Sequence, residues 1–184
     1  LLRPLLALRQ MALDNRRKIL WSVLVVGGGL GIYTGVLLQT MVARPLWNSG
    51  LLGPLFLASG VSAGAALYML LRADPAPFSA LLKWDIGALI LEGLLLGLLL
   101  MEKLGGAPAD RAAAASLMGG PYTGVFFGLV IIGGILVPLA METIELRNPR
   151  KHSLFAPALV LVGSFSLRAV MVVAGMASGV RLLG

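Results

Sequence analysis

Apolar stretches about as long as a membrane is thick are the feature that most constrains this chain. A helix needs roughly 20 mostly apolar residues to cross about 30 Å of hydrocarbon. Hydrophobic residues make up 58% of the sequence and charged residues 12%, whereas soluble domains carry about a quarter charged residues. The sequence therefore predicts an all-α fold, a single polytopic transmembrane helix bundle over residues 1–184. The five expected spans cover about 19–42, 51–71, 84–101, 121–141 and 154–176.

The distribution of basic residues predicts the orientation of the bundle, because Lys and Arg are retained on the cytoplasmic side. The first 18 residues hold Arg3, Arg9, Arg16, Arg17 and Lys18. The connection between the first and second spans holds only Arg44. The connection between the fourth and fifth spans holds Arg147, Arg150 and Lys151. We expect a multi-pass protein of a bacterial or archaeal cell membrane, with the amino end cytoplasmic and the carboxyl end outside. The formal charge of +7 then reflects topology and not nucleic-acid binding.

Metal-binding residue types are nearly absent. The chain has no cysteine, and its only histidine is His152, in a polar connection. Iron–sulfur clusters and a pair of intramembrane histidines for haem therefore have no ligands here. We expect no metal, haem or iron–sulfur cluster in this chain, so any such centre in an electron-transfer reaction belongs to a partner.

Glycine recurs at four-residue spacing in several spans, which predicts seams where helix backbones approach closely. These glycines are Gly27, Gly31 and Gly35; Gly60 and Gly64; Gly93 and Gly97; and Gly120, Gly124 and Gly128. Two irregular features are also expected, a short interfacial helix within 104–120 and a kink at Pro138. Because the sequence starts at Leu1 without a signal-peptide pattern, we expect a piece of a longer protein.

Ionisable side chains inside the spans cost on the order of 3 kcal/mol each and need a reason. Asp85 and Glu92 lie two helical turns apart, on one face of the third span. Asp85 and Glu142 are expected to be hydrated at the interface. Glu92 and Arg168 are expected to meet near mid-membrane. This pair has two interpretations that the sequence leaves open, a structural salt bridge and a proton relay in which a carboxylate exchanges protons along a water-filled path.

Tyr33 is the remaining polar side chain of interest. It precedes Arg44 by about eleven residues, or about 16 Å along a helix, which is too deep for an interfacial belt. A phenol hydroxyl group at that depth needs a hydrogen-bond partner, and a quinone carbonyl group is a suitable one.

The sequence around Tyr33 resembles the NrfD-like family, which includes the membrane subunit of polysulfide reductase. The resemblance rests on Tyr33, on Arg44-Pro45-Leu46-Trp47-Asn48, on Phe56-x-x-Ser59-Gly60-x-x-x-Gly64, on Lys83-Trp84-Asp85 to Glu92, and on Arg168 followed by Val173-Ala174-Gly175. It extends over essentially the whole chain. The resemblance implies an eight-helix protein, of which this chain is similar to roughly the last five helices. The N-terminal helices of the family are therefore expected to be missing.

The resemblance implies a quinone-reactive anchor subunit of a respiratory oxidoreductase complex. Such a subunit exchanges electrons between menaquinol or ubiquinol and an iron–sulfur partner subunit, which serves a molybdopterin catalytic subunit. The position matching Tyr33 helps to hold the quinone, and the subunit is not catalytic alone. Asp85, Glu92, Glu142 and Arg168 are then candidates for a proton pathway or a buried ion pair. An alternative function is a proton-conducting or transporter protein that uses Asp85, Glu92 and Arg168. A passive anchor is a further possibility.

Overall fold

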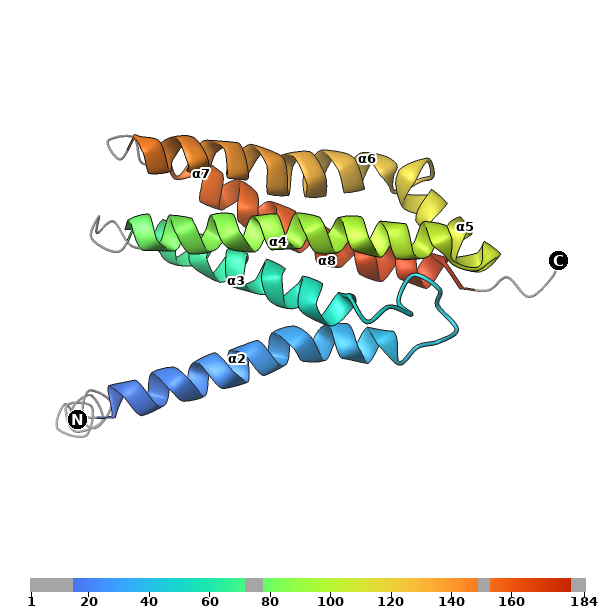
Figure 1. Ribbon diagram of the computed structural model, residues 1–184, viewed down its shortest axis with the longest axis horizontal. Coiled ribbons are helices and arrows are strands. Elements are labelled where there is room, and N and C mark those ends of the chain that lie inside the picture. Colours follow the sequence, from blue (N-terminus) through green and yellow to red (C-terminus); the bar gives the residue numbers. More distant parts are fainter. Residues whose placement is uncertain (1–14, 72–77, 149–152, 180–184) are drawn as a thin grey trace, which may run out of the picture.

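The protein is an elongated bundle of helices that run roughly along one axis (Figure 1). The computed structural model describes residues 15–71, 78–148 and 153–179. The basic residues 3, 9, 150 and 151, and His152, lie outside the described residues. The helices are α2 (Arg16–Gln39), α3 (Leu52–Leu71), α4 (Phe78–Gly105), α5 (Pro108–Met118), α6 (Thr123–Val125), the π-helix η1 (Phe126–Leu136), α7 (Val137–Arg147) and α8 (Phe155–Ala177).

Five helical segments are long and apolar enough to cross a membrane, which confirms the predicted all-α, multi-pass fold. The third span is longer than predicted at both ends, because α4 begins at Phe78 and ends at Gly105. The fourth, made of α6, η1 and α7, continues to Arg147. Since α2 begins and α8 ends at opposite ends of the bundle (Figure 1), the arrangement of the helices agrees with an odd number of crossings.

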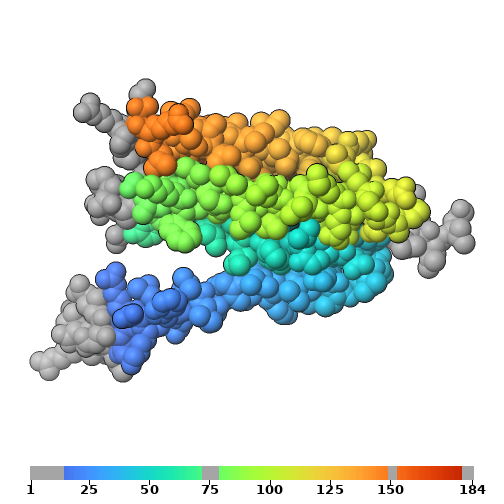
Figure 2. All heavy atoms as spheres, in the orientation of Figure 1, coloured from blue at the N-terminus to red at the C-terminus, as the bar shows by residue number. Residues whose placement is uncertain are grey.

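Helix α2 is the least integrated span. Only 6% of its most apolar window is buried, against 50% for α8. Its second half packs on α3, where a Cβ atom built on Gly35 would lie 2.5 Å from Gly53. The beginning of α2 stands apart from the other helices on the face shown in Figure 2. A Cβ atom added to Gly27, Gly28 or Gly29 would accordingly have no neighbour within 4 Å.

The expected glycine seams are only partly confirmed within the described residues. Gly64, Gly97, Gly124 and Gly128 also face open space. The closest backbone contact between η1 and α8 is instead made by Gly134 and Gly163, where a Cβ atom on Gly134 would lie 2.5 Å from the Gly163 Cα atom. Four-residue spacing of glycine identified faces with small side chains, but it did not identify which faces have a neighbour.

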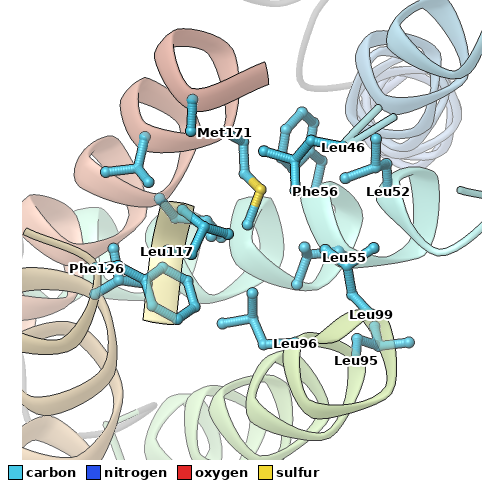
Figure 3. Close-up of a cluster of buried hydrophobic side chains, with 14 of the residues drawn as sticks. Leu46, Leu52, Leu55, Phe56, Leu95, Leu96, Leu99, Leu117, Phe126 and Met171 are labelled. Carbon is cyan, nitrogen blue, oxygen red and sulfur yellow. The ribbon is translucent and has the colours of Figure 1, made fainter. Parts of the chain in front are cut away.

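The main hydrophobic core lies where α3, α4, α5 and α8 converge. Figure 3 shows Leu117 of α5 between Phe126 and Met171, with Leu55 and Leu96 on the facing helices. Helix α5 confirms the expected short helix within 104–120. Its start is fixed locally, because Pro108 occupies the first turn and the Asp110 carboxylate accepts a hydrogen bond from the Ala107 backbone N–H group at 3.1 Å. The loop-helix unit thereby closes one end of the bundle.

Pro138 lies in the first turn of α7, which directly follows η1 in the sequence. The turns before it form the π-helix η1, which ends at Leu136, and α-helical geometry resumes at Val137. A π-helix pairs backbone groups over five residues instead of four, so the hydrogen-bond pattern already changes before the proline that lacks an N–H group. A change in helix type thus precedes Pro138, and the kink expected there stays a prediction.

Candidate functional site

Tyr33 lies on the exposed side of α2. It is about half a helical turn from both Gly31 and Gly35, the residues that contact α3, and so faces away from that helix. Its side chain is 58% exposed. The described part of the chain supplies no hydrogen-bond partner for its hydroxyl group. Because this surface belongs to a membrane-spanning helix, the phenol is available to a ligand or a protein surface within the membrane.

A second polar region lies inside the bundle, between α3 and α8. Arg168 donates a hydrogen bond from Nη1 to the Ser164 Oγ atom at 2.6 Å, and the Ser164 and Ser59 hydroxyl groups are 2.8 Å apart. The second guanidinium nitrogen, Nη2, donates to the Phe56 carbonyl oxygen at 3.3 Å. The guanidinium carbon also lies 5.8 Å from the centre of the Phe56 ring, within cation–π range. Gly60 leaves the space beside this nitrogen free of a side chain.

Glu92 reaches the same region from α4. It is 3% exposed, its carboxyl group lies within hydrogen-bonding reach of the Ser59 hydroxyl group, and it interacts electrostatically with Arg168. The described residues contain no direct Glu92–Arg168 ion pair. Two serine hydroxyl groups connect the two charged groups instead, in the order Arg168, Ser164, Ser59 and Glu92. The arrangement places a guanidinium group and a carboxyl group at the two ends of a chain of hydroxyl groups inside the membrane span.

Asp85 and Glu142 form a further acidic pair, between α4 and α7. Both side chains are completely buried, with 0% exposure. The expectation that they are hydrated at an interface is therefore wrong. Helices α4 and α7 extend beyond both residues and pack together, which removes their carboxyl groups from the surface. The Ser62 hydroxyl group donates a hydrogen bond to Asp85, and the Asp85 and Glu142 carboxyl groups are within hydrogen-bonding reach of each other.

The turn between α2 and α3 attaches to the end of α8. Trp47 is 5% exposed and donates from its indole Nε1 atom to the Met171 carbonyl oxygen at 2.8 Å. Arg44 donates to the Met176 carbonyl oxygen. A tryptophan in a short turn between spans is typical of the membrane interface, but Trp47 fills the space beside Gly175 inside the bundle. The Arg44–Asn48 turn is thus a structural anchor whose tryptophan is buried.

A buried lysine that the sequence did not single out stabilises the same end of the bundle. Lys103 is 2% exposed and donates a hydrogen bond to the Asn48 carbonyl oxygen at 2.6 Å. It also lies 3.5 Å from Glu102 and 3.6 Å from Asp110. Ser49 donates to Glu102 at 2.7 Å. These contacts join the turn, α4 and α5, whose Leu46, Leu99 and Leu117 belong to the hydrophobic cluster in Figure 3.

The described geometry defines a polytopic helical membrane protein with a polar interior and an exposed intramembrane tyrosine. The family described as "Polysulphide reductase, NrfD" matches residues 5–179, so the chain belongs to the NrfD family. It is 31% identical to a protein of Wolinella succinogenes that is named as one of the chains of polysulfide reductase, over 91% of this chain and 56% of that protein.

Two further relatives agree with this assignment. The protein NrfD homolog of Haemophilus influenzae is 31% identical over 82% of this chain and 50% of its own length. Protein NrfD of Escherichia coli is 31% identical over 83% of this chain and 51% of its own length. The chain thus spans about half the length of the curated relatives it matches. No solved structure gives a significant match.

Proposed function

We propose that this chain is the quinone-reactive part of a membrane anchor subunit in a respiratory oxidoreductase complex. It would exchange electrons between menaquinol or ubiquinol and an iron–sulfur partner subunit that serves a molybdopterin catalytic subunit. The observation that carries the proposal is Tyr33, whose hydroxyl group is exposed on a membrane-spanning helix and has no partner among the described residues. Membership of the NrfD family supports it, as does the similarity to a protein named as one of the chains of a polysulfide reductase.

The residues present fit a quinone. Around Tyr33, α2 exposes apolar side chains that include Leu30, Val36 and Leu37, which suit an isoprenoid tail, and the phenol suits a quinone oxygen. A quinol supplies electrons together with protons. Tyr33 would orient the head group by accepting or donating one hydrogen bond, and a second wall of the pocket would come from outside the described residues.

Replacing Tyr33 by Phe in the full complex tests the proposal. The variant keeps the ring and loses the hydroxyl group, so we expect quinol-dependent reduction to fall about tenfold or more, which corresponds to about 1.4 kcal/mol. Electron transfer from an artificial donor directly to the partner subunits should be unchanged. Tyr68→Phe is the matched control, because Tyr68 is a second exposed tyrosine, on α3. Unchanged turnover and quinol affinity in Tyr33→Phe would contradict the proposal.

The second candidate is a proton-conducting or transporter protein, favoured by the buried carboxyl groups of Asp85 and Glu92 and by the serine chain to Arg168. Buried ionisable groups in membrane spans are a general sign of proton and ion pathways. The two candidates differ in their need for a redox partner. Proton or solute movement by the isolated subunit in proteoliposomes, without quinol or partner subunits, would favour transport, whereas movement that requires quinol oxidation would favour the quinone-reactive subunit.

A further inference from the structure

Two carboxyl groups meet inside the bundle where α4 packs on α7. Asp85 and Glu142 are both fully buried, and each lies within hydrogen-bonding reach of the other. Ser62 satisfies one Asp85 oxygen. The other Asp85 oxygen and both Glu142 oxygens have no hydrogen-bond donor in the described structure. Three unsatisfied oxygen atoms therefore face a site with no solvent exposure.

Electrostatics limits the charge that such a pair can carry. Ionised carboxylates supply only hydrogen-bond acceptors, and two like charges in contact repel strongly where water is excluded. The described residues contain no lysine or arginine in an ion pair with either group. A single proton between the two groups removes one negative charge and converts an acceptor–acceptor contact into a hydrogen bond.

We propose that Asp85 and Glu142 form a binding site for one proton, held between α4 and α7. The proposal does not depend on the quinone chemistry at Tyr33. The titratable groups nearest to the pair on its own helices are Glu145 on α7 and Glu92 on α4. On α3 the facing group is the neutral Ser62. Arg168 of α8 interacts with Glu92 and with the serine chain instead.

Glu145 gives the site a route for exchange. It lies one helical turn beyond Glu142, towards the end of α7, and is 5% exposed. Its Oε1 atom accepts a hydrogen bond from the Ser153 backbone N–H group at 3.0 Å. A carboxylate between the pair and the helix end can pass the proton to that end of the bundle, whereas the path towards Glu92 is two turns of α4 long.

Infrared spectroscopy of the full chain in lipid nanodiscs tests the proposal, because the C=O stretch of a protonated carboxyl group is resolved from that of a carboxylate. At neutral pH the wild-type protein should show a protonated-carboxyl band that is lost in Asp85→Asn and in Glu142→Gln. Either variant is sufficient if the other fails to fold. Glu102→Gln, which changes an exposed carboxylate beside Lys103, should retain the band. Glu145→Gln should retain the band. In heavy water the band shifts as the carboxyl proton exchanges for deuterium, and this exchange should be slower in Glu145→Gln.

Three results would overturn the proposal. The first is a band that persists in either pair variant that folds, and the second is a band lost only in Glu92→Gln, which would assign the proton to Glu92. The third is loss of the wild-type band on replacing potassium chloride by sodium chloride, which would assign the site to a sodium ion. None of these measurements uses quinol, so their outcome is separate from that of Tyr33→Phe.

Discussion

Arg168 is stabilised inside a membrane span without a carboxylate in direct contact. Its guanidinium group makes hydrogen bonds to Ser164 and to the Phe56 carbonyl oxygen, and hydroxyl groups connect it to Glu92. The sequence predicted that Glu92 and Arg168 come together, because both are ionisable residues in spans of the same direction. It did not predict the role of the serines, since a hydroxyl group in a helix can also bond to the backbone of its own helix.

Arg168→Lys tests whether the hydrogen bonds of the guanidinium group, and not only its positive charge, stabilise the protein. Lysine keeps the positive charge but cannot reach Ser164 and the Phe56 carbonyl oxygen together, so we expect a loss of about 1–3 kcal/mol in stability. Thermal unfolding of the purified protein in detergent measures this loss. The control is Lys18→Arg on the exposed start of α2, which should have no effect on stability. Lys103 does not serve as a control because it is itself buried. Equal stability of Arg168→Lys and wild type would contradict a stabilising role for these hydrogen bonds.

Trp47→Phe tests the anchor between the first turn and α8. Phenylalanine fills much of the same space but lacks the indole N–H group that bonds the Met171 carbonyl oxygen. The expected loss is about 1 kcal/mol, again measured by thermal unfolding. Trp21→Phe is the matched control, because Trp21 is 60% exposed on α2 and should tolerate the change. A larger loss of thermal stability in Trp21→Phe than in Trp47→Phe would contradict the role of Trp47 as the buried anchor.

At the scale of the helices, hydropathy predicted the number and approximate position of the spans, because membrane thickness sets their length. It did not predict their ends. Helix α4 runs past both predicted limits, since Lys103 and Glu102 find partners at one end and the helix begins before Lys83 at the other. Polar residues that pack against another element extend a helix beyond its apolar stretch, and their partners are distant in the sequence.

Gly163→Val tests the contact between α8 and η1. A larger side chain would collide with the Gly134 backbone, and overpacking of this kind typically costs about 1–3 kcal/mol. We expect lower thermal stability and earlier aggregation on size-exclusion chromatography. Gly64→Val introduces the same side chain at a position with open space and should be tolerated. Similar losses from both substitutions would show that valine itself, and not the helix contact, is responsible.

At the scale of the whole molecule, the orientation in the membrane stays a prediction from the basic residues, several of which lie outside the described residues. Because the chain has no cysteine, single-cysteine variants report orientation cleanly. A membrane-impermeant maleimide should label Ala109→Cys on α5 in intact spheroplasts, and Ser153→Cys only after permeabilisation. The opposite pattern would place the carboxyl end of the bundle in the cytoplasm.

Tyr33 and the buried acidic residues lie in different parts of the molecule. Depth in the first span singled out Tyr33 from the sequence, and the structure places it on the outer side of α2, away from Glu92 and Asp85. The sequence could not show this separation, since the rotation of α2 is set by its contact with Gly53 on α3. The proposed quinone site and the buried acidic pair are therefore distinct regions of one bundle.

Photolabelling of the full complex with an azido-quinone tests the central claim most directly, because it reports where the head group binds. We predict that this chain is labelled, that the labelled residues lie on the side of α2 that carries Tyr33, and that excess unlabelled quinone and Tyr33→Phe both reduce the labelling. Labelling confined to another subunit, or to helices of this chain other than α2, would contradict the claim that Tyr33 belongs to the quinone site.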